Sequence, residues 1–249
     1  MNLPSSALTL SKVTLFLQAL DKCYGLYKEK SKRQDQINID LNSFDAVLFH
    51  SPYCKLVQKS LARLAFNDFK ADPSVYSEAL QSSFAQISLE ESYFNKDVEK
   101  AFMDLSKESF EKKTQPSLLI ATNVGNMYTP SLYGGLVSLV CSHDRVEDLV
   151  GKRVALFSYG SGLTSSFFSV RAVDCQAMTD LHSSLAEVHH RLKSRTKVSP
   201  EDFAQTMKLR EETHHLAPYQ PVASIETLFS ATWYLDSVDD KHRRKYLKT

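Results

Sequence analysis

Residues 46–63 of the chain read AVLFHSPYCKLVQKSLAR. The first four of them form an unbroken apolar run, which is typical of a short buried strand. His50 follows where this strand ends. Ser51 and Pro52 then predict a helix start, with Ser51 as the N-cap and Pro52 at the first helical position.

The helix predicted from Pro52 to about Phe69 carries Lys55 and Lys59, which share one face because they are four residues apart. Ligands of open α/β sheets collect at the carboxyl ends of the strands. An imidazole there, beside a helix start with two cations, suits an anion or acyl ligand. The residues alone leave the alternatives open, because a lone histidine near a strand is more often structural and two lysines are usually a solvated face.

The composition is that of an ordinary globular protein. The 249 residues are 43% hydrophobic and 24% charged, which suits one large domain or two small ones. The net charge of +1 implies no general attraction to nucleic acid, and we expect no nucleic-acid partner. The four cysteines are scattered without a C-x-x-C pair, which argues against a zinc site or a disulfide framework.

Nothing in the sequence predicts a membrane span or a targeting segment. No run of 18 apolar residues occurs, and residues 1–11 lack the basic and apolar regions of a secretory signal. The first arginine is Arg33, whereas mitochondrial transit peptides are rich in arginine. The expected location is therefore the cytoplasm.

Several further elements are predicted on either side of this stretch. Thr9 to Lys30 and Asn95 to Lys113 have the apolar spacing of amphipathic helices. Ser117 to Ala121, after Pro116, is predicted to be a buried strand. Gly125 and Asn126 predict a turn, in which glycine takes a positive φ and asparagine bonds its own backbone.

The second half of the chain contains a predicted hairpin and then changes character. Val154–Tyr159 and Thr164–Val173 are predicted strands joined by the turn Gly160-Ser161-Gly162. Beyond Cys175, residues 180–195 have the pattern of a surface helix. A further helix is predicted to start with Ser199 as N-cap and Pro200 at its first position. The chain is expected to end in a strand over 231–238 and a frayed basic tail over 241–248.

Three patterns that resemble catalytic motifs are set aside. Gly160-Ser161-Gly162 is neither a dinucleotide-binding fingerprint nor a nucleophile elbow. Cys54 lies four residues from His50, but it falls on the apolar stripe of its helix, where a buried thiol is inert. The adjacent pairs His189-His190 and His214-His215 do not face one ligand, so we expect no metal site.

The chain nevertheless resembles a known family over most of its length. Residues 50–63, 125–129, 157–162, 232–235 and 241–244 are similar, in the family's order, to the C-terminal half of hydroxymethylglutaryl-coenzyme A (HMG-CoA) synthase. The resemblance implies a thiolase-like layered α/β sandwich, of which this chain is the C-terminal half, with a mixed sheet flanked by helices. Within a single synthase C-terminal domain over 1–249, it implies three parts: an N-terminal helix (1–30), the α/β core (46–175), and a helical C-terminal part ending in a short strand and basic tail (176–249).

The resemblance also implies an activity and assigns residues to it. Family members are acyltransferases that condense acetyl-CoA with acetoacetyl-CoA, and these substrates are used without a further cofactor. His50 matches the histidine that binds the acetoacetyl thioester and polarises its carbonyl. Lys55 and Lys59 match contacts to coenzyme A, Asn126 matches a contact to the acyl group, and Ser161 matches a residue of the substrate pocket.

The catalytic cysteine and glutamate of the family belong to its N-terminal half, which this chain does not contain. We therefore expect the lone chain to be inactive and to expose an apolar face that the other half covers. Expected partners are a second copy, as in a homodimer, and an N-terminal half or a full-length synthase. A non-catalytic module that binds coenzyme A or pairs with a synthase is the alternative. Cytoplasmic family members serve isoprenoid and sterol synthesis, and mitochondrial ones serve ketone-body synthesis, which is the alternative if the true N-terminus is missing.

Overall fold

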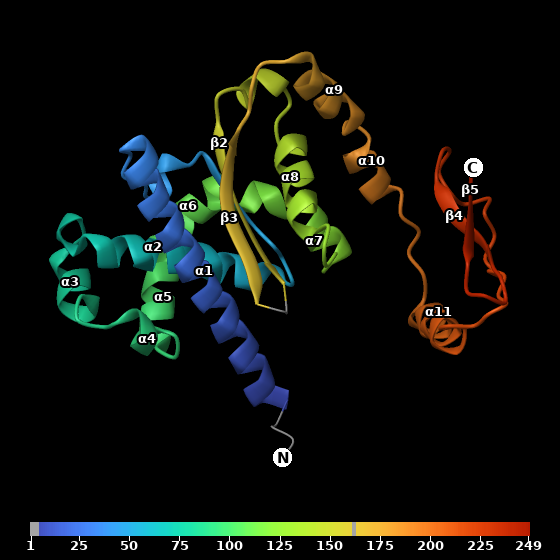
Figure 1. Ribbon diagram of the computed structural model, residues 1–249, viewed down its shortest axis with the longest axis horizontal. Helices are drawn as coiled ribbons and strands as arrows, with labels where there is room; N and C mark the ends of the chain where they lie inside the picture. The colour runs from blue at the N-terminus through green and yellow to red at the C-terminus, as the bar shows by residue number, and fades with distance from the viewer. Residues whose placement is uncertain (1–4, 161–162) are drawn as a thin grey trace. The chain divides into compact units, whose positions relative to one another are not determined.

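A computed structural model describes residues 5–160 and 163–249 of the chain (Figure 1). It divides into two compact units, residues 1–193 and 194–249, which we describe separately. None of the helices in the described part of the chain combines the length and hydropathy that crossing a membrane would require.

The first unit is built on a three-stranded mixed sheet. Its strands, in the spatial order β1-β2-β3, are β1 (Ala46–Phe49), β2 (Arg153–Gly160) and β3 (Thr164–Arg171). β1 runs parallel to β2, with Phe49 opposite Phe157, and β3 returns antiparallel to β2. The predicted hairpin is therefore confirmed, although Ser161 and Gly162 of its turn lie outside the described residues.

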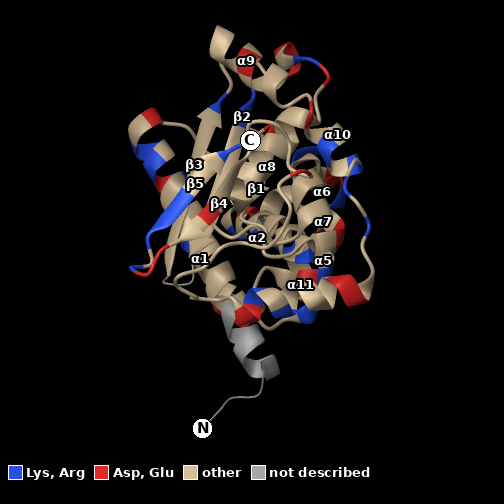
Figure 2. Ribbon diagram, turned by 90° about the vertical axis from the view of Figure 1, so that its right-hand side faces the viewer, with Lys and Arg blue, Asp and Glu red and all other residues tan. Residues whose placement is uncertain are grey.

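Helices cover both faces of the sheet, and successive side chains of β1 point alternately to one face and to the other. Val47 and Phe49 join the cluster formed with α1 (Ser5–Asp35) and α2 (Cys54–Ala71). Ala46 and Leu48 point into a second cluster under α8 (Ser131–Cys141). Figure 1 shows α1 and α8 on opposite sides of β2 and β3. Figure 2 shows hardly any charged residues along these two strands, as expected for a sheet between two apolar layers.

Short helices fill the connection between α2 and α8. Their core is a set of aromatic rings in which Phe102 lies edge-on to Phe66 at 4.9 Å between centroids. The helix predicted over 95–113 is interrupted at Ser106, whose φ of −87° and ψ of 4° separate two helices. The short helices of this connection are α3 (Glu78–Phe84), α4 (Leu89–Ser92), α5 (Lys96–Leu105), α6 (Lys107–Lys113) and α7 (Leu119–Val124). The 3₁₀ turns of the first unit are η1 (Leu41–Ser43), η2 (Pro73–Val75), η3 (Gln115–Leu118) and η4 (Val146–Asp148).

The strand predicted over Ser117–Ala121 is wrong, because the chain is helical there, in η3 and α7. Two tertiary hydrogen bonds account for the difference. Thr114 Oγ1 donates to the carbonyl of Val47 at 2.8 Å, and the Ile120 amide donates to Ser138 Oγ of α8 at 3.0 Å. A short apolar run cannot by itself distinguish a buried strand from a buried helical turn.

The predicted start of α2 is also wrong. The helix begins at Cys54, and Tyr53 is its N-cap residue without a capping side-chain hydrogen bond. Ser51 is buried, and its backbone amide instead donates to Ser131 Oγ on α8 at 2.9 Å. A tertiary contact thus replaces the local cap, and residues 50–53 form an irregular link between β1 and α2.

A buried ion pair joins α1 to α2. The Arg63 guanidinium donates to both oxygens of Asp21, and the shortest of these distances is 2.6 Å, from Nη2 to Oδ2. Asn67 and Tyr93 also donate to the Asp21 carboxylate. Both charged side chains are about 95% buried, at 6% and 5% exposure.

The first unit ends in two helices where one was predicted over 180–195. They are α9 (Gln176–Ser184) and α10 (Val188–Lys193). Histidines hold them against the end of α8, since His182 Nε2 lies 2.9 Å from the carbonyl of His143 and His189 Nε2 lies 3.1 Å from that of Cys141.

The second unit contains one helix and a hairpin. In α11 (Pro200–Glu212), Ser199 accepts a hydrogen bond from the Asp202 amide, which confirms the predicted N-cap. β4 (Trp233–Val238) pairs antiparallel with β5 (Arg244–Lys248), so the frayed tail predicted over 241–248 is wrong. Within this unit only Val238 is buried.

Candidate functional site

His50 lies immediately after β1, at the carboxyl end that the sequence predicted. Its backbone amide donates to the carbonyl of Phe157 in β2 at 2.8 Å, which continues the β1–β2 pairing by one residue. The side chain is partly buried, and this burial lowers the pKa of His50 below its ordinary value. Burial thus favours the neutral imidazole, which offers one N–H donor and one acceptor nitrogen.

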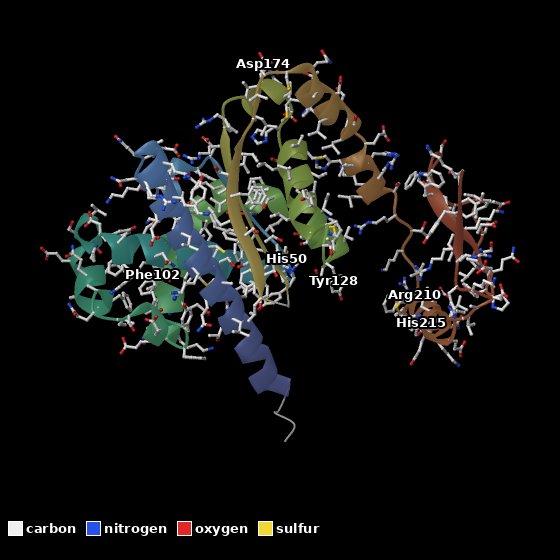
Figure 3. The ribbon with its side chains drawn as sticks, viewed as in Figure 1. His50, Phe102, Tyr128, Asp174, Arg210 and His215 are labelled. Carbon is white, nitrogen blue, oxygen red and sulfur yellow. The ribbon has the colours of Figure 1, made fainter. Side chains whose placement is uncertain are left out.

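The imidazole lines a cavity of about 410 Å³ at the end of the sheet. Tyr128 and Thr129 line it from the turn before α8, and Figure 3 shows His50 and Tyr128 in this region. Most of the remaining lining comes from hydroxyl-bearing residues of β2 and β3: Ser158, Tyr159, Thr164, Ser165 and Ser166. The cavity thus combines one imidazole with many hydroxyl groups, which suits a polar, uncharged ligand group such as a carbonyl.

The turn that contributes Tyr128 has the geometry predicted for Gly125 and Asn126. Gly125 has a φ of +85°, and Asn126 Oδ1 accepts a hydrogen bond from the Tyr128 amide at 2.9 Å. Tyr128 itself has a φ of +56°, a conformation that non-glycine residues seldom adopt. Asn126 therefore stabilises the turn that carries Tyr128, but it does not itself line the cavity.

A close approach of the turn to α8 fixes its position. A Cβ atom added to Gly134 would overlap the end of the Met127 side chain. The glycine thus allows Met127 to lie directly against the first turns of α8. This approach brings the turn's next two residues, Tyr128 and Thr129, beside the cavity.

The two predicted lysines do not reach this cavity. Lys55 is exposed, its Nζ donates to Gln58 Oε1 at 2.9 Å, and it lines a separate groove of about 660 Å³ between α2, α7 and α8. Lys59 pairs with Glu99 at 2.9 Å. The structure therefore separates Lys55 from His50 and leaves Lys59 engaged by a carboxylate of α5.

Ser161 lies outside the described residues. Gly160, which precedes it, and Thr164, three residues after it, both line the His50 cavity. Cys54 is half-buried rather than buried, and its Sγ lies 3.7 Å from Thr122 Oγ1. Among the described residues, no group of three or more His, Cys, Asp or Glu side chains could hold a metal ion.

The sequence reasoning missed Tyr128 and the hydroxyls of β2 and β3. The serines at 158, 165 and 166 lie on the predicted hairpin, where polar residues on an exposed strand face are ordinary, so they gave no signal. Tyr128 lies within the family-like stretch 125–129 but was not singled out, since a tyrosine in a turn is indistinguishable from a surface residue until its neighbours are known.

Comparison with known proteins assigns the chain to a family. Residues 8–249 match the family model described as "Hydroxymethylglutaryl-coenzyme A synthase C terminal". The chain belongs to the HMG-CoA synthase family. It is 48% identical over 244 residues to HMG-CoA synthase 2 of Blattella germanica, covering 94% of this chain and 53% of that protein. It is 47% identical to the cytoplasmic synthase of Mus musculus and 44% identical to the mitochondrial synthase of Rattus norvegicus, each over 248 residues. Both matches cover 95% of this chain, with 48% of the Mus musculus protein and 49% of the Rattus norvegicus protein.

Solved synthase structures share the fold. "MvaS in complex with 3-hydroxy-3-methylglutaryl coenzyme A" superposes with a TM-score of 0.69 at 23% identity, covering 99% of this chain and 51% of that one. PksG, an HMG-CoA synthase from Bacillus subtilis, superposes with a TM-score of 0.64 at 16% identity, covering 94% of this chain and 51% of that one. The predicted thiolase-like α/β class is confirmed. The chain spans about half the length of the synthases it matches.

Proposed function

We propose that this chain is the substrate-binding half of an HMG-CoA synthase, an acyltransferase that condenses acetyl-CoA with acetoacetyl-CoA. One observation carries the proposal: the family match runs through His50, and His50 is the imidazole that lines the hydroxyl-rich cavity. A neutral imidazole can donate a hydrogen bond to the carbonyl of an acyl thioester. A donor placed in this way stabilises a developing oxyanion by about 2.7–4 kcal/mol.

The other family residues are assigned around this contact. Asn126 is proposed to donate its amide N–H to the acyl group, which requires its side chain to turn toward the cavity that it does not line in this structure. Ser161 is proposed to line the cavity. Lys55 and Lys59 are proposed to contact coenzyme A, whose phosphates suit lysine as a point charge. For Lys59 this requires release from Glu99, since the two side chains are paired. No cofactor besides the two substrates is proposed.

The chain alone is proposed to be inactive, because the family's cysteine nucleophile and glutamate acid–base belong to the N-terminal half. We assign neither role to a residue of this chain. An N-terminal half or full-length synthase is the proposed partner, and a homodimer the proposed assembly. The proposed setting is cytoplasmic isoprenoid and sterol synthesis. The mitochondrial relative at 44% identity supports the alternative of a mitochondrial location.

Isothermal titration calorimetry with acetoacetyl-CoA and with free coenzyme A tests this assignment. The wild-type chain is expected to bind acetoacetyl-CoA more tightly. His50→Ala should weaken that binding by roughly 2- to 12-fold, the value of one hydrogen bond, and leave the affinity for coenzyme A unchanged. His190→Ala is the matched control, because His190 is an exposed histidine whose charged neighbour is Glu187.

Equal affinity of the wild-type chain for both ligands would contradict the assignment, as would an equal loss of both in His50→Ala. The same protein, supplied with acetyl-CoA and acetoacetyl-CoA, should release no HMG-CoA above the blank. Product formation would show that the lone chain is not merely a binding half.

A second candidate is a non-catalytic module that pairs with a synthase. It is favoured by the unit 194–249, where only Val238 is buried while Trp233 is 67% and Val222 72% exposed. Apolar surface of this kind marks an interaction site or an aggregation risk. A pull-down with the tagged chain that recovers no synthase, together with no binding of coenzyme A, would remove this candidate.

A further inference from the structure

We propose that Ser131, the first residue of α8, is a positioning residue that holds His50 in the cavity. The inference rests on the proposed role of His50 and adds to it a residue that neither the sequence nor the family resemblance singled out. Ser131 is 2% exposed and does not line the cavity, so it acts through its neighbours rather than by touching a ligand.

The hydroxyl of Ser131 binds the backbone of the residue after His50. The Ser51 amide donates to Ser131 Oγ at 2.9 Å, and Ser131 Oγ lies 3.4 Å from the Ser51 carbonyl. On its other side, His50 is held through its own amide by Phe157. The backbone at His50 and Ser51 is thus held by β2 through Phe157 and by α8 through Ser131.

Ser131 also holds a second segment that lines the same cavity. Its backbone amide donates to the carbonyl of Tyr128 at 3.0 Å. Tyr128 and His50 both line the cavity, and they belong to segments 78 residues apart in sequence. One buried serine therefore sets the position of both segments at once.

The need for this contact follows from where Ser51 lies. Residues 50–53 belong to neither β1 nor α2, so no regular backbone partner is available to the Ser51 amide. Ser51 is 3% exposed, and its own Oγ is buried without a hydrogen-bond partner among the described residues. Removing the Ser131 hydroxyl would leave the Ser51 amide buried and unpaired as well, and the link would move to reach water.

The test compares Ser131→Ala with Ser138→Ala in the same helix. Ser138 is a matched control, because its buried hydroxyl also joins two segments, accepting from the Ile120 amide and donating to the Gly134 carbonyl. Ser131→Ala is expected to lower the preference for acetoacetyl-CoA over coenzyme A by roughly 2- to 10-fold, because the misplaced His50 would lose about one hydrogen bond to the acyl group. It should also move the His50 ring pKa, followed by NMR, toward its ordinary value as water enters. Ser138→Ala should change neither the ligand preference nor the His50 ring pKa. Ser131→Thr, which keeps the hydroxyl, should show the wild-type preference and the wild-type ring pKa.

The proposal is overturned if Ser131→Ala matches Ser138→Ala in both measurements. Should Ser131→Ala fail to fold, amide hydrogen exchange of the wild-type chain decides: slow exchange at Ser51 supports the contact, and exchange at the rate of an open loop overturns it. Failure of the proposed function is distinguishable, because then the wild-type chain itself would show no preference for acetoacetyl-CoA.

Discussion

Arg63→Ala is expected to lower the free energy of unfolding by about 3–5 kcal/mol, because it leaves the Asp21 carboxylate buried without its cation. Asp21 would keep the hydrogen bonds from Asn67 and Tyr93, but neither neutralises its charge. The substitution also removes the guanidinium from the face of the Tyr93 ring, 4.3 Å from the ring centroid. Urea unfolding followed by circular dichroism measures the loss.

Two comparisons make this prediction specific to the buried pair. Lys112→Ala breaks an exposed pair with Glu108, at 71% and 79% exposure, and should be far less destabilising than Arg63→Ala. Replacing the pair together, as Asp21→Leu with Arg63→Met, should be much less destabilising than Arg63→Ala, since no buried charge remains. A loss in Arg63→Ala no larger than that in Lys112→Ala would show that the pair is not buried as described.

Phe157→Ala should have an effect of similar size, about 3–5 kcal/mol, because it empties the centre of the sheet. Phe157 is fully buried in β2 and lies edge-on to Phe16 of α1 at 5.3 Å and to Phe49 of β1 at 6.5 Å. The loss of this ring removes contacts to a helix and to a neighbouring strand at once. Because the Phe157 carbonyl also holds the amide of His50, the same variant should loosen the candidate site.

Phe168→Ala provides the control for Phe157→Ala. Phe168 stands on the neighbouring strand β3, opposite Leu156, and is 39% exposed. Its truncation should cost clearly less than that of Phe157, since more than a third of Phe168 is already exposed to water and less apolar surface is lost from the core. Equal losses in the two variants would contradict the placement of Phe157 at the centre of the sheet.

The parts of the fold that were predictable are those fixed by local pattern. The apolar run of β1 with His50 at its end, the β2–β3 hairpin, and the N-cap at Ser199 each follow from residues that are adjacent in the chain. Periodicity and capping are local signals, so a single sequence carries them.

The errors arose where a distant contact overrides such a signal. Ser51 and Pro52 have the pattern of a helix start, yet the Ser51 amide is bound by a residue 80 positions away. The apolar run 117–121 forms helical turns because Ser138 binds the Ile120 amide. The basic tail forms β5 because β4 supplies a pairing edge.

The residues of the candidate site also fall into those that local sequence predicts and those that depend on distant contacts. His50 and the turn at Gly125 and Asn126 were predicted from local pattern, and their role came from family resemblance. The pairing of Lys59 with Glu99 could not be predicted, because sequence spacing does not show which residue of α5 faces α2. The position of Tyr128 beside the cavity could not be predicted either, because it depends on how the turn packs on α8.

The NMR titration of the His50 ring is the most direct test of the proposed site, with the His50 signals assigned among the eight histidines by a His50→Gln variant. In the free chain its pKa should lie below the ordinary value for histidine, since burial disfavours the charged form. Saturating acetoacetyl-CoA should shift the His50 ring signals, and the same concentration of coenzyme A should shift them much less. If acetoacetyl-CoA binds while the His50 signals stay in place, the acyl group does not meet His50, and the proposed site is wrong.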